Sequence, residues 1–289
     1  MTEPREITWR SSDGLTLFAR DHGSATPGKL PVICIPGLTR NSRDFEELAP
    51  WIASRGRRVI AVDLRGRGRS DRDPNPQHYA PPTYAADMVA LLDSIGAPRA
   101  LFVGTSLGGI VTMTLASKHI DRIGGAVLND VGPVIAKEGL ARISGYAGKA
   151  PALKSWADAV GYAKQTGGVA FPGYTDADWG VFVRRIFKEG ADGVPVLECD
   201  PRVFRPTHPL LVWLMTPLVW AMFRKLATGR PVLLVRGAIS DVLSVPTATR
   251  MRHEAKDMGY VEIENVGHAP TLSEPRAKES LERFFTEAP

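Results

Sequence analysis

Short, continuously apolar runs alternate with amphipathic stretches along the first half of the chain. The apolar runs lie at 31–35, 59–62, 100–103 and 127–129. The stretches between them repeat their apolar residues at helical spacing, at 45–54, 84–95 and 110–116. Strands that are apolar on both faces and alternate with helices are typical of a parallel sheet covered on both sides. The pattern therefore predicts an α/β fold.

The ends of the chain extend this pattern. Two alternating runs flank the turn residues Ser11–Gly14, which indicates a β-hairpin near the start. Apolar runs return at 231–235 and 260–263, and 274–286 has the spacing of a last helix. For the helix over 84–95, Thr83 is a plausible N-cap and Gly96 a plausible residue after its last turn.

The strand pattern is absent between about residues 134 and 228. Scattered aromatic residues and amphipathic stretches take its place, and they predict a helical insertion. We therefore expect a core in two parts, 1–133 and 230–289, separated by a helical cap over 134–229. Most of the cap aromatics should form its own core, with two or three facing a substrate. The longest apolar run, 209–223, is shorter than a membrane span; we interpret it as a buried or lid-forming helix, with a lipid-interface helix as the alternative.

Composition places the chain among globular proteins with a large core. It has 289 residues, of which 44% are hydrophobic and 23% charged. Cys34 and Cys199 are the two cysteines, too few for a disulfide framework, which favours a reducing compartment. The first residues are charged and lack an apolar signal segment. We therefore expect a cytoplasmic location.

A net charge of +5 raises the question of nucleic-acid binding. The arginines are densest at positions 55, 57, 58, 65, 67 and 69. The apolar run 59–62 divides this group and no aromatic residue is interleaved with it, so we interpret it as solvated loops and expect no nucleic-acid partner. The glycines of 63–70 match neither a dinucleotide fingerprint nor a P-loop.

The strongest local motif is Gly104-Thr105-Ser106-Leu107-Gly108. It stands between an apolar run and a helical stretch, which is the strand–turn–helix context of a nucleophile elbow. A serine hydroxyl can attack only if it projects from a tight turn, and flanking glycines remove the Cβ atoms that would clash there. Ser106 is therefore the candidate nucleophile.

Further reactive residue types follow other predicted strands. Leu38 follows the first apolar run, Asp241 the run at 231–235, and His268 the run at 260–263. Catalytic groups in open α/β sheets gather at the carboxyl ends of the strands, and the chain order Ser, Asp, His is that of the α/β-hydrolase fold.

On these segments the chain resembles the α/β-hydrolases of the esterase, lactonase and C–C hydrolase group with a helical cap. The segments are 35–38, 63–70, 104–109, 236–241 and 266–270. The family usually has His-Gly where this chain has Pro36-Gly37, a departure that bears on the shape of the oxyanion loop.

The chemistry of such a site assigns the roles. Ser106 would attack, His268 would act as the base, and Asp241 would orient the imidazole. The N–H groups of Leu38 and Leu107 would form the oxyanion hole. Asp130 is the alternative acid, because some members take it from the strand after the nucleophile helix.

The predicted function is hydrolysis of a carboxylic ester or lactone of a small, largely apolar substrate through an acyl-Ser106 intermediate. The same residues could serve a C–C bond hydrolase of a diketone-type substrate, and a non-catalytic ligand receptor could share the fold. We expect no cofactor, and no metal because no Cys/His ligand spacing is present. His208, in the insertion, is a candidate substrate contact. Acyl length and oligomeric state stay open.

Overall fold

A mostly parallel sheet of eight strands forms the centre of the structure, a computed structural model that describes residues 3–204 and 209–289. Its order is β1-β2-β4-β3-β5-β6-β9-β10. The strands are β1 (Arg5–Arg10), β2 (Thr16–His22), β3 (Val32–Ile35), β4 (Val59–Asp63), β5 (Ala100–Thr105), β6 (Ile123–Asn129), β9 (Val232–Gly237) and β10 (Gly259–Ile263). The predicted α/β fold is confirmed.

The first two strands form the predicted hairpin at one edge of the sheet. β1 pairs antiparallel with β2, and β2 pairs antiparallel with β4. From β4 to β10 every neighbouring pair is parallel. Strands β3 to β6 are fully buried, which is why their sequences are apolar without alternation.

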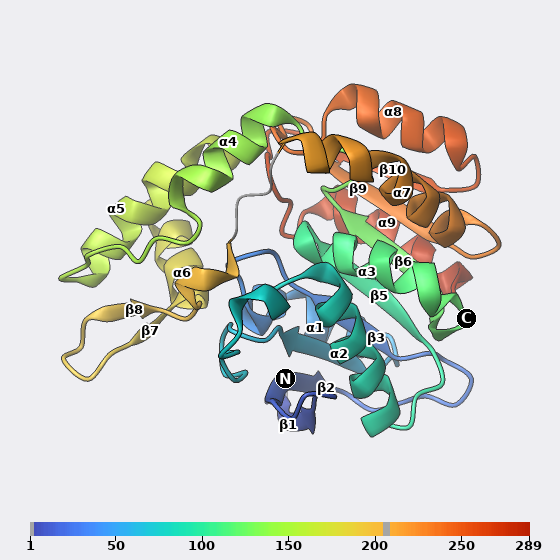
Figure 1. The fold of residues 1–289 in the computed structure, drawn as a ribbon, viewed down its shortest axis with the longest axis horizontal. Helices are drawn as coiled ribbons and strands as arrows, with labels where there is room; N and C mark the ends of the chain where they lie inside the picture. Colours follow the sequence, from blue (N-terminus) through green and yellow to red (C-terminus); the bar gives the residue numbers. More distant parts are fainter. Residues whose placement is uncertain (1–2, 205–208) are drawn as a thin grey trace.

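Helices cover both faces of the sheet, as Figure 1 shows. One face packs against α2 (Pro81–Ser94), α3 (Leu107–Lys118), α7 (Pro209–Ala227) and α8 (Val245–Glu254). The other packs against α1 (Leu48–Ala53) and α9 (Pro275–Glu287). Each face has its own cluster of buried apolar side chains, so the core lies in two layers on either side of the strands.

A smaller group of elements projects to one side of the sheet (Figure 1). It contains α4 (Lys137–Tyr146), α5 (Trp156–Gly167), α6 (Asp176–Ile186) and a two-stranded hairpin of β7 (Phe187–Glu189) and β8 (Pro195–Leu197). Short 3₁₀ turns occur at Ser42–Phe45, Pro76–His78, Ile120–Arg122, Gly168–Ala170 and Pro201–Val203. The sequence missed the hairpin because strands of three residues are too short to show a period.

Helix α7 covers the longest apolar run, which the sequence interpreted as a buried or lid-forming helix within 134–229. It packs against α3, and Trp220, Phe223 and Leu226 are buried in the core layer. Its central proline, Pro217, lies inside the helix. The projecting group therefore begins at α4 and ends before α7. His208, the predicted substrate contact in this region, lies outside the described residues.

The start of α2 also differs. Ala80 is the residue before the first turn, with extended backbone angles, and Pro81 occupies the first helical position, where its fixed φ suits the helix. Thr83 therefore lies inside the helix and not at its cap. Gly96 has a φ of +67°, the conformation expected after a helix end.

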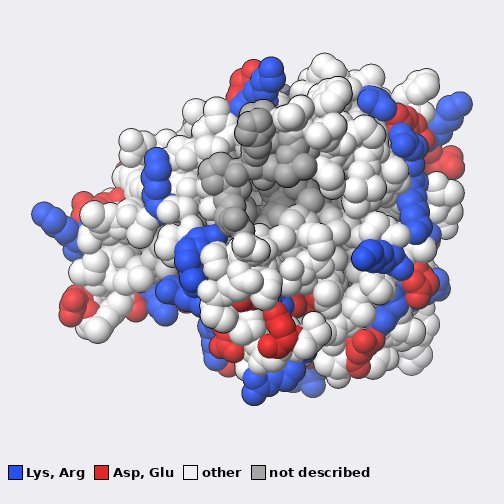
Figure 2. Space-filling model, in the orientation of Figure 1, with Lys and Arg blue, Asp and Glu red and all other residues white. Residues whose placement is uncertain are grey.

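The arginine-rich segments are not a solvated surface as a whole. Arg57, Arg65 and Arg67 are buried, and Arg65 pairs with Asp13, Asp73 and Asp87. Among the described residues on the face seen in Figure 2, Lys and Arg side chains are interspersed with Asp and Glu. Within the described part of the chain, no helix is long and apolar enough to cross a bilayer.

Candidate active site

Ser106 stands at the sharp turn between β5 and α3. Its φ is +52° and its ψ −113°, a strained conformation for a residue with a side chain. The glycines on either side permit it: a Cβ on Gly104 would come within 2.4 Å of the Gly108 carbonyl carbon, and one on Gly108 within 2.1 Å of the Ile35 carbonyl oxygen. The motif thus folds as the predicted elbow, with the hydroxyl at the carboxyl edge of the sheet.

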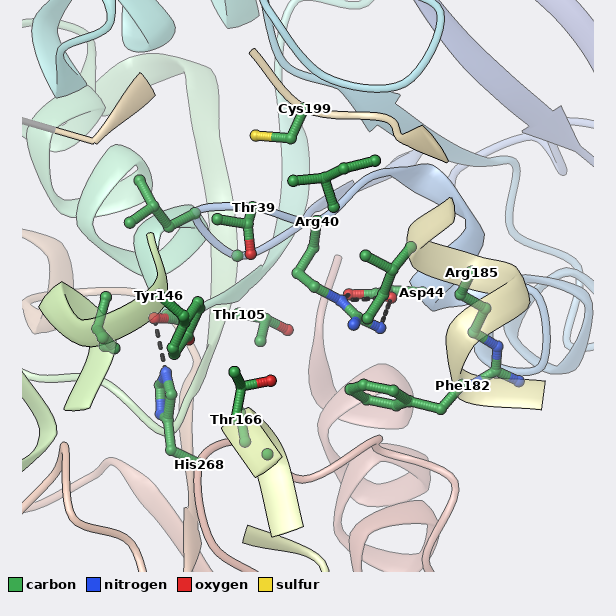
Figure 3. A pocket seen from close by; sticks show the side chains of 18 of the residues that line it. Thr39, Arg40, Asp44, Thr105, Tyr146, Thr166, Phe182, Arg185, Cys199 and His268 are labelled. Atoms are coloured by element: carbon green, nitrogen blue, oxygen red, sulfur yellow. Dashed lines mark hydrogen bonds and ion pairs between the residues drawn. The ribbon is translucent and has the colours of Figure 1, made fainter. Parts of the chain in front are cut away.

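His268 lies in the loop after β10 and reaches both a hydroxyl and a carboxylate. Its Nε2 is 2.8 Å from the Ser106 Oγ and its Nδ1 is 2.7 Å from the Asp130 Oδ2. His268 is labelled at the pocket in Figure 3. With the proton on Nδ1, the ring donates to the carboxylate and accepts from the hydroxyl. The three side chains form one continuous hydrogen-bonded chain.

Asp130 is fixed by several donors. It follows β6, has a φ of +54° and is fully buried. The Gly237 N–H donates to its Oδ1 at 2.9 Å, and the Ser240 hydroxyl donates to its Oδ2 at 2.6 Å. Strand β6 lies between β5 and β9, so the sheet order itself places this carboxylate between the serine and the loop after β9.

Asp241 is not brought to His268, which corrects the expectation for the acid. Its carboxylate accepts two hydrogen bonds from Arg142 of α4, from Nε at 2.6 Å and from Nη2 at 2.8 Å. Burial opposes its ionisation, but the hydrogen bonds and charge of Arg142 leave the pKa of Asp241 below its ordinary value. Asp241 thus links the projecting group to the core, and the alternative acid, Asp130, contacts the imidazole.

Leu38 and Leu107 lie on opposite sides of the serine. Leu107 is the first residue of α3, so its N–H has no acceptor in the preceding turn. A Cβ on Gly37 would be 3.8 Å from the Ser106 Cβ, which puts the Leu38 peptide beside the serine. Among the backbone hydrogen bonds of residues 3–204 and 209–289, neither Leu38 nor Leu107 donates its N–H. Both groups can therefore bind an oxygen next to Ser106.

The segment 63–70 supports the Leu38 loop. Asp63 is buried and accepts from the Ser42 N–H at 2.7 Å and from the Arg69 N–H at 2.8 Å. Gly68, with a φ of +55°, passes so close that a Cβ would meet the Asp63 carboxylate at 2.1 Å. The glycine and arginine pattern of this segment therefore has a structural role, in agreement with its poor match to a phosphate loop.

A pocket opens in front of Ser106, between the sheet edge and the projecting group (Figure 3). From the insertion, the aromatic residues Tyr146, Tyr162, Phe171 and Phe182 line it. The sequence predicted that two or three aromatic residues of the insertion would face a substrate, and these four line the pocket. Burial raises the pKa of Tyr146, so its hydroxyl stays protonated near neutral pH.

The pocket is more polar than the sequence suggested. Basic side chains line it at Arg40, Arg142, Lys149 and Arg185, and acidic ones at Asp44 and Asp200. In Figure 3 the Arg40 guanidinium points into the pocket beside Asp44 and Phe182; it pairs with Asp44 and lies 4.3 Å from the centre of the Phe182 ring. No sequence signal identified Arg40 or Arg142, because a charged residue on a helix or loop is usually solvated.

One group of side chains has the spacing of a metal site. Asp13, Asp73 and His78 hold their ligand atoms within 4.8 Å of one another. Arg65 Nη1 already donates to both carboxylates, at 2.7 and 2.5 Å. The guanidinium thus supplies the positive charge that these aspartates need, and the group is explained as part of a buried ion-pair network.

Comparisons with known proteins agree with this fold. The model of the alpha/beta hydrolase family matches residues 32–278. A 3-hydroxybutyrate-oligomer hydrolase from Cupriavidus necator is 34% identical over 263 residues, which cover 89% of this chain and 88% of that protein. The crystal structure of an alpha/beta hydrolase from Novosphingobium aromaticivorans has a TM-score of 0.90 at 38% identity, over 99% of both chains.

A more distant solved structure shows the same fold. An esterase from Exiguobacterium antarcticum has a TM-score of 0.70 at 18% identity, over 97% of this chain and 99% of that one. The family model spans most of the sequence, including the segments that carry Ser106, Asp130 and His268. The chain therefore belongs to the alpha/beta hydrolase family, and it is a hydrolase like the relatives it resembles.

Proposed function

We propose that the protein is a serine hydrolase that cleaves carboxylic esters through an acyl-Ser106 intermediate. The single observation that carries this is the chain of hydrogen bonds from Ser106 through His268 to Asp130, which opens on a pocket. A serine hydroxyl is a weak nucleophile on its own, and this arrangement supplies the adjacent base and the group that orients it.

In the first step the Ser106 Oγ attacks the ester carbonyl carbon while His268 Nε2 takes the hydroxyl proton. The imidazolium that forms is stabilised by the Asp130 carboxylate, which is held by the Gly237 N–H and the Ser240 hydroxyl. The carbonyl oxygen becomes an oxyanion that the N–H groups of Leu38 and Leu107 bind.

The tetrahedral intermediate then collapses. The C–O bond to the alcohol breaks, and His268 returns the proton to the leaving oxygen. A water molecule, deprotonated by the same imidazole, attacks the acyl-serine and releases the acid with Ser106 regenerated. Each step uses the contacts already present around Ser106 and needs no further group.

The substrates to test first are short oligomers of hydroxy acids. The relative with this activity in its name covers most of the chain at 34% identity. Such oligomers contain ester bonds and end in a carboxylate, and four basic against two acidic side chains line the pocket. Aromatic residues from the insertion would contact the apolar parts of the chain.

Hydrolysis by the purified protein is the direct test. Dimers and trimers of 3-hydroxybutyrate, p-nitrophenyl esters, lactones and a diketone are compared by acid release, with a fluorophosphonate probe used to label the nucleophile. We expect ester cleavage and one labelled residue, Ser106, located by peptide mass spectrometry. Ser106→Ala and His268→Ala should each lose about 10⁴-fold or more in kcat while keeping the fold.

Three results would contradict the proposal. Labelling at another residue with activity intact would remove Ser106 as nucleophile. Turnover of the diketone with no turnover of any ester would assign the site to C–C bond hydrolysis. If the folded protein binds esters without cleaving them and is not labelled, it is a receptor and not an enzyme.

A further inference from the structure

Arg67 is a buried cation beside the oxyanion loop. Its exposed fraction is 1%, and within the described parts of the chain no carboxylate forms an ion pair with it. Arginine is almost never fully buried without an acidic partner, because removing the charge from water costs free energy. The neighbouring Arg65 follows that rule with three aspartates; Arg67 does not.

The contacts of Arg67 join the Leu38 loop, the Arg67 segment itself and helix α2. Its Nε donates to the Leu38 carbonyl oxygen at 2.8 Å. Its Nη1 donates to the Arg65 carbonyl oxygen at 2.8 Å and to the Tyr84 hydroxyl at 2.7 Å. Its Nη2 is buried and has no hydrogen-bond partner. The guanidinium carbon lies 4.9 Å from the centre of the Tyr84 ring.

The bond to the Leu38 carbonyl restrains the loop that carries one oxyanion donor. It holds the Leu38–Thr39 peptide, and the Gly37–Leu38 peptide, whose N–H lies beside Ser106, is joined to it at the Leu38 Cα. With one peptide held by a buried guanidinium, the rotations at Leu38 that would turn the other are restricted. Oxyanion holes depend on donors that are already oriented when the charge develops.

We propose that Arg67 is a positioning residue for the oxyanion hole, and that its unpaired positive charge favours the oxyanion. The inference rests on the proposed serine mechanism. A guanidinium without a carboxylate partner keeps its full positive charge, and an interior of low polarity screens that charge less than water would. The charge interacts with an oxyanion and not with a neutral ester, so it acts on the transition state selectively.

The projecting group helps to hold Arg67 in place. Arg67 forms a β-bridge with Cys199, the Gly68 N–H donates to the Glu198 carbonyl at 2.8 Å, and the Asp200 N–H donates to the Gly66 carbonyl at 2.7 Å. Burial raises the pKa of the Cys199 thiol to about 11, so this neighbour is neutral and does not cancel the charge. The end of the projecting group is therefore attached to the segment that orients Leu38.

The test compares Arg67→Met and Arg67→Lys with Arg57→Met. Arg57 is a matched control because it is also buried and donates only to backbone carbonyls, but near α9 and away from Leu38. Rates on a short p-nitrophenyl ester are expressed per site titrated by the fluorophosphonate. Affinity is measured for a trifluoromethyl ketone, which forms a tetrahedral oxyanion on serine.

We expect Arg67→Met to lower kcat about 10–100-fold with KM changed less than about threefold. The affinity for the trifluoromethyl ketone should fall by a factor similar to that of kcat. Arg67→Lys keeps the charge without the fork that reaches Leu38 and should fall between. Arg57→Met should lower the melting temperature and leave both readouts per titrated site unchanged.

Equal kcat and equal ketone affinity in Arg67→Met and wild type, per titrated site, would overturn the inference. If Arg67→Met does not fold, Arg67→Lys decides it in the same way. A wild-type protein that is neither labelled nor active overturns the proposed function and this inference with it. A labelled, active wild type with unaffected Arg67 variants overturns this inference alone.

Discussion

Two carboxylates follow neighbouring strands and have opposite surroundings. Asp130, after β6, is fully buried and contacts His268, Ser240 and the Gly237 N–H. Asp241, after β9, keeps 27% of its side chain exposed and pairs with Arg142 of α4. Both follow strands of the parallel part of the sheet, which made both candidate acids. What distinguishes the two carboxylates is their hydrogen-bond partners, and not how strongly apolar the preceding strand is.

The difference shows what each loop contributes. A carboxylate that orients an imidazole must be rigid, and backbone and hydroxyl donors fix Asp130 without adding a competing positive charge. A carboxylate that accepts both N–H groups of an arginine is already satisfied. Asp241 therefore connects two parts of the molecule, while Asp130 is available to His268.

Among the changes around the two carboxylates, Asp130→Asn should lower kcat the most. The amide can no longer accept the Nδ1 proton as a carboxylate does, so the imidazole loses its correct tautomer and its stabilising charge, and we expect kcat to fall about 10³–10⁴-fold. Asp241→Asn is the matched control and should keep kcat within about threefold. Steady-state rates on one ester measure both; a larger loss in Asp241→Asn would reverse the assignment of the acid.

Ser240→Ala should have an intermediate effect. It removes the hydroxyl that donates to Asp130 Oδ2 at 2.6 Å and leaves the Gly237 N–H in place. A hydrogen bond to a charged group contributes about 1.5–3 kcal/mol, so kcat should drop about tenfold or somewhat more. Ser244→Ala, at the N-cap of α8, is the control for a lost hydroxyl in the same region. No change of kcat in Ser240→Ala would mean that the Gly237 N–H alone fixes the carboxylate.

A smaller effect is expected at the Arg142–Asp241 pair. Arg142→Gln, Asp241→Asn and the double variant should each lower stability by no more than about 1 kcal/mol, because both side chains are partly exposed. The double variant should be close to either single one, since all three remove the same interaction. Additive losses in urea unfolding would show that the two side chains act independently.

The smallest effect concerns acid stability. The pKa of Asp241 is lowered in the folded protein, so its contribution to stability is present above the unfolded pKa of about 3.9 and is lost as the pH falls through the folded value. The difference in unfolding free energy between wild type and Asp241→Asn should therefore be constant near neutral pH and shrink in acid. A difference that grows as the pH falls would contradict a stabilising ion pair.

The positions of Ser106, His268 and the strands could be predicted because each depends on local sequence. A Cβ at position 104 or 108 would clash with backbone atoms, so the two glycines mark the tight turn. Buried parallel strands appear in the sequence as continuous apolar runs. The choice between Asp130 and Asp241 could not be predicted, because both follow a strand. The donors that decide it are distant in the sequence from the carboxylates they bind: Ser240 donates to Asp130, and Arg142 donates to Asp241. The same holds for Arg67, whose burial depends on the 198–200 segment packing over it.

By itself, the sequence determined the sheet, the elbow and the histidine loop, because hydrophobic periodicity and the placement of glycines are properties of residues close together in the chain. Tertiary structure decided which carboxylate meets the imidazole, that α7 packs on α3, and that Arg57, Arg65 and Arg67 are buried. These outcomes depend on which hydrogen-bond donors and acceptors still lack a partner once the strands have paired into the sheet. That is a property of the packed molecule, because a hydrogen bond between distant residues has no period along the chain.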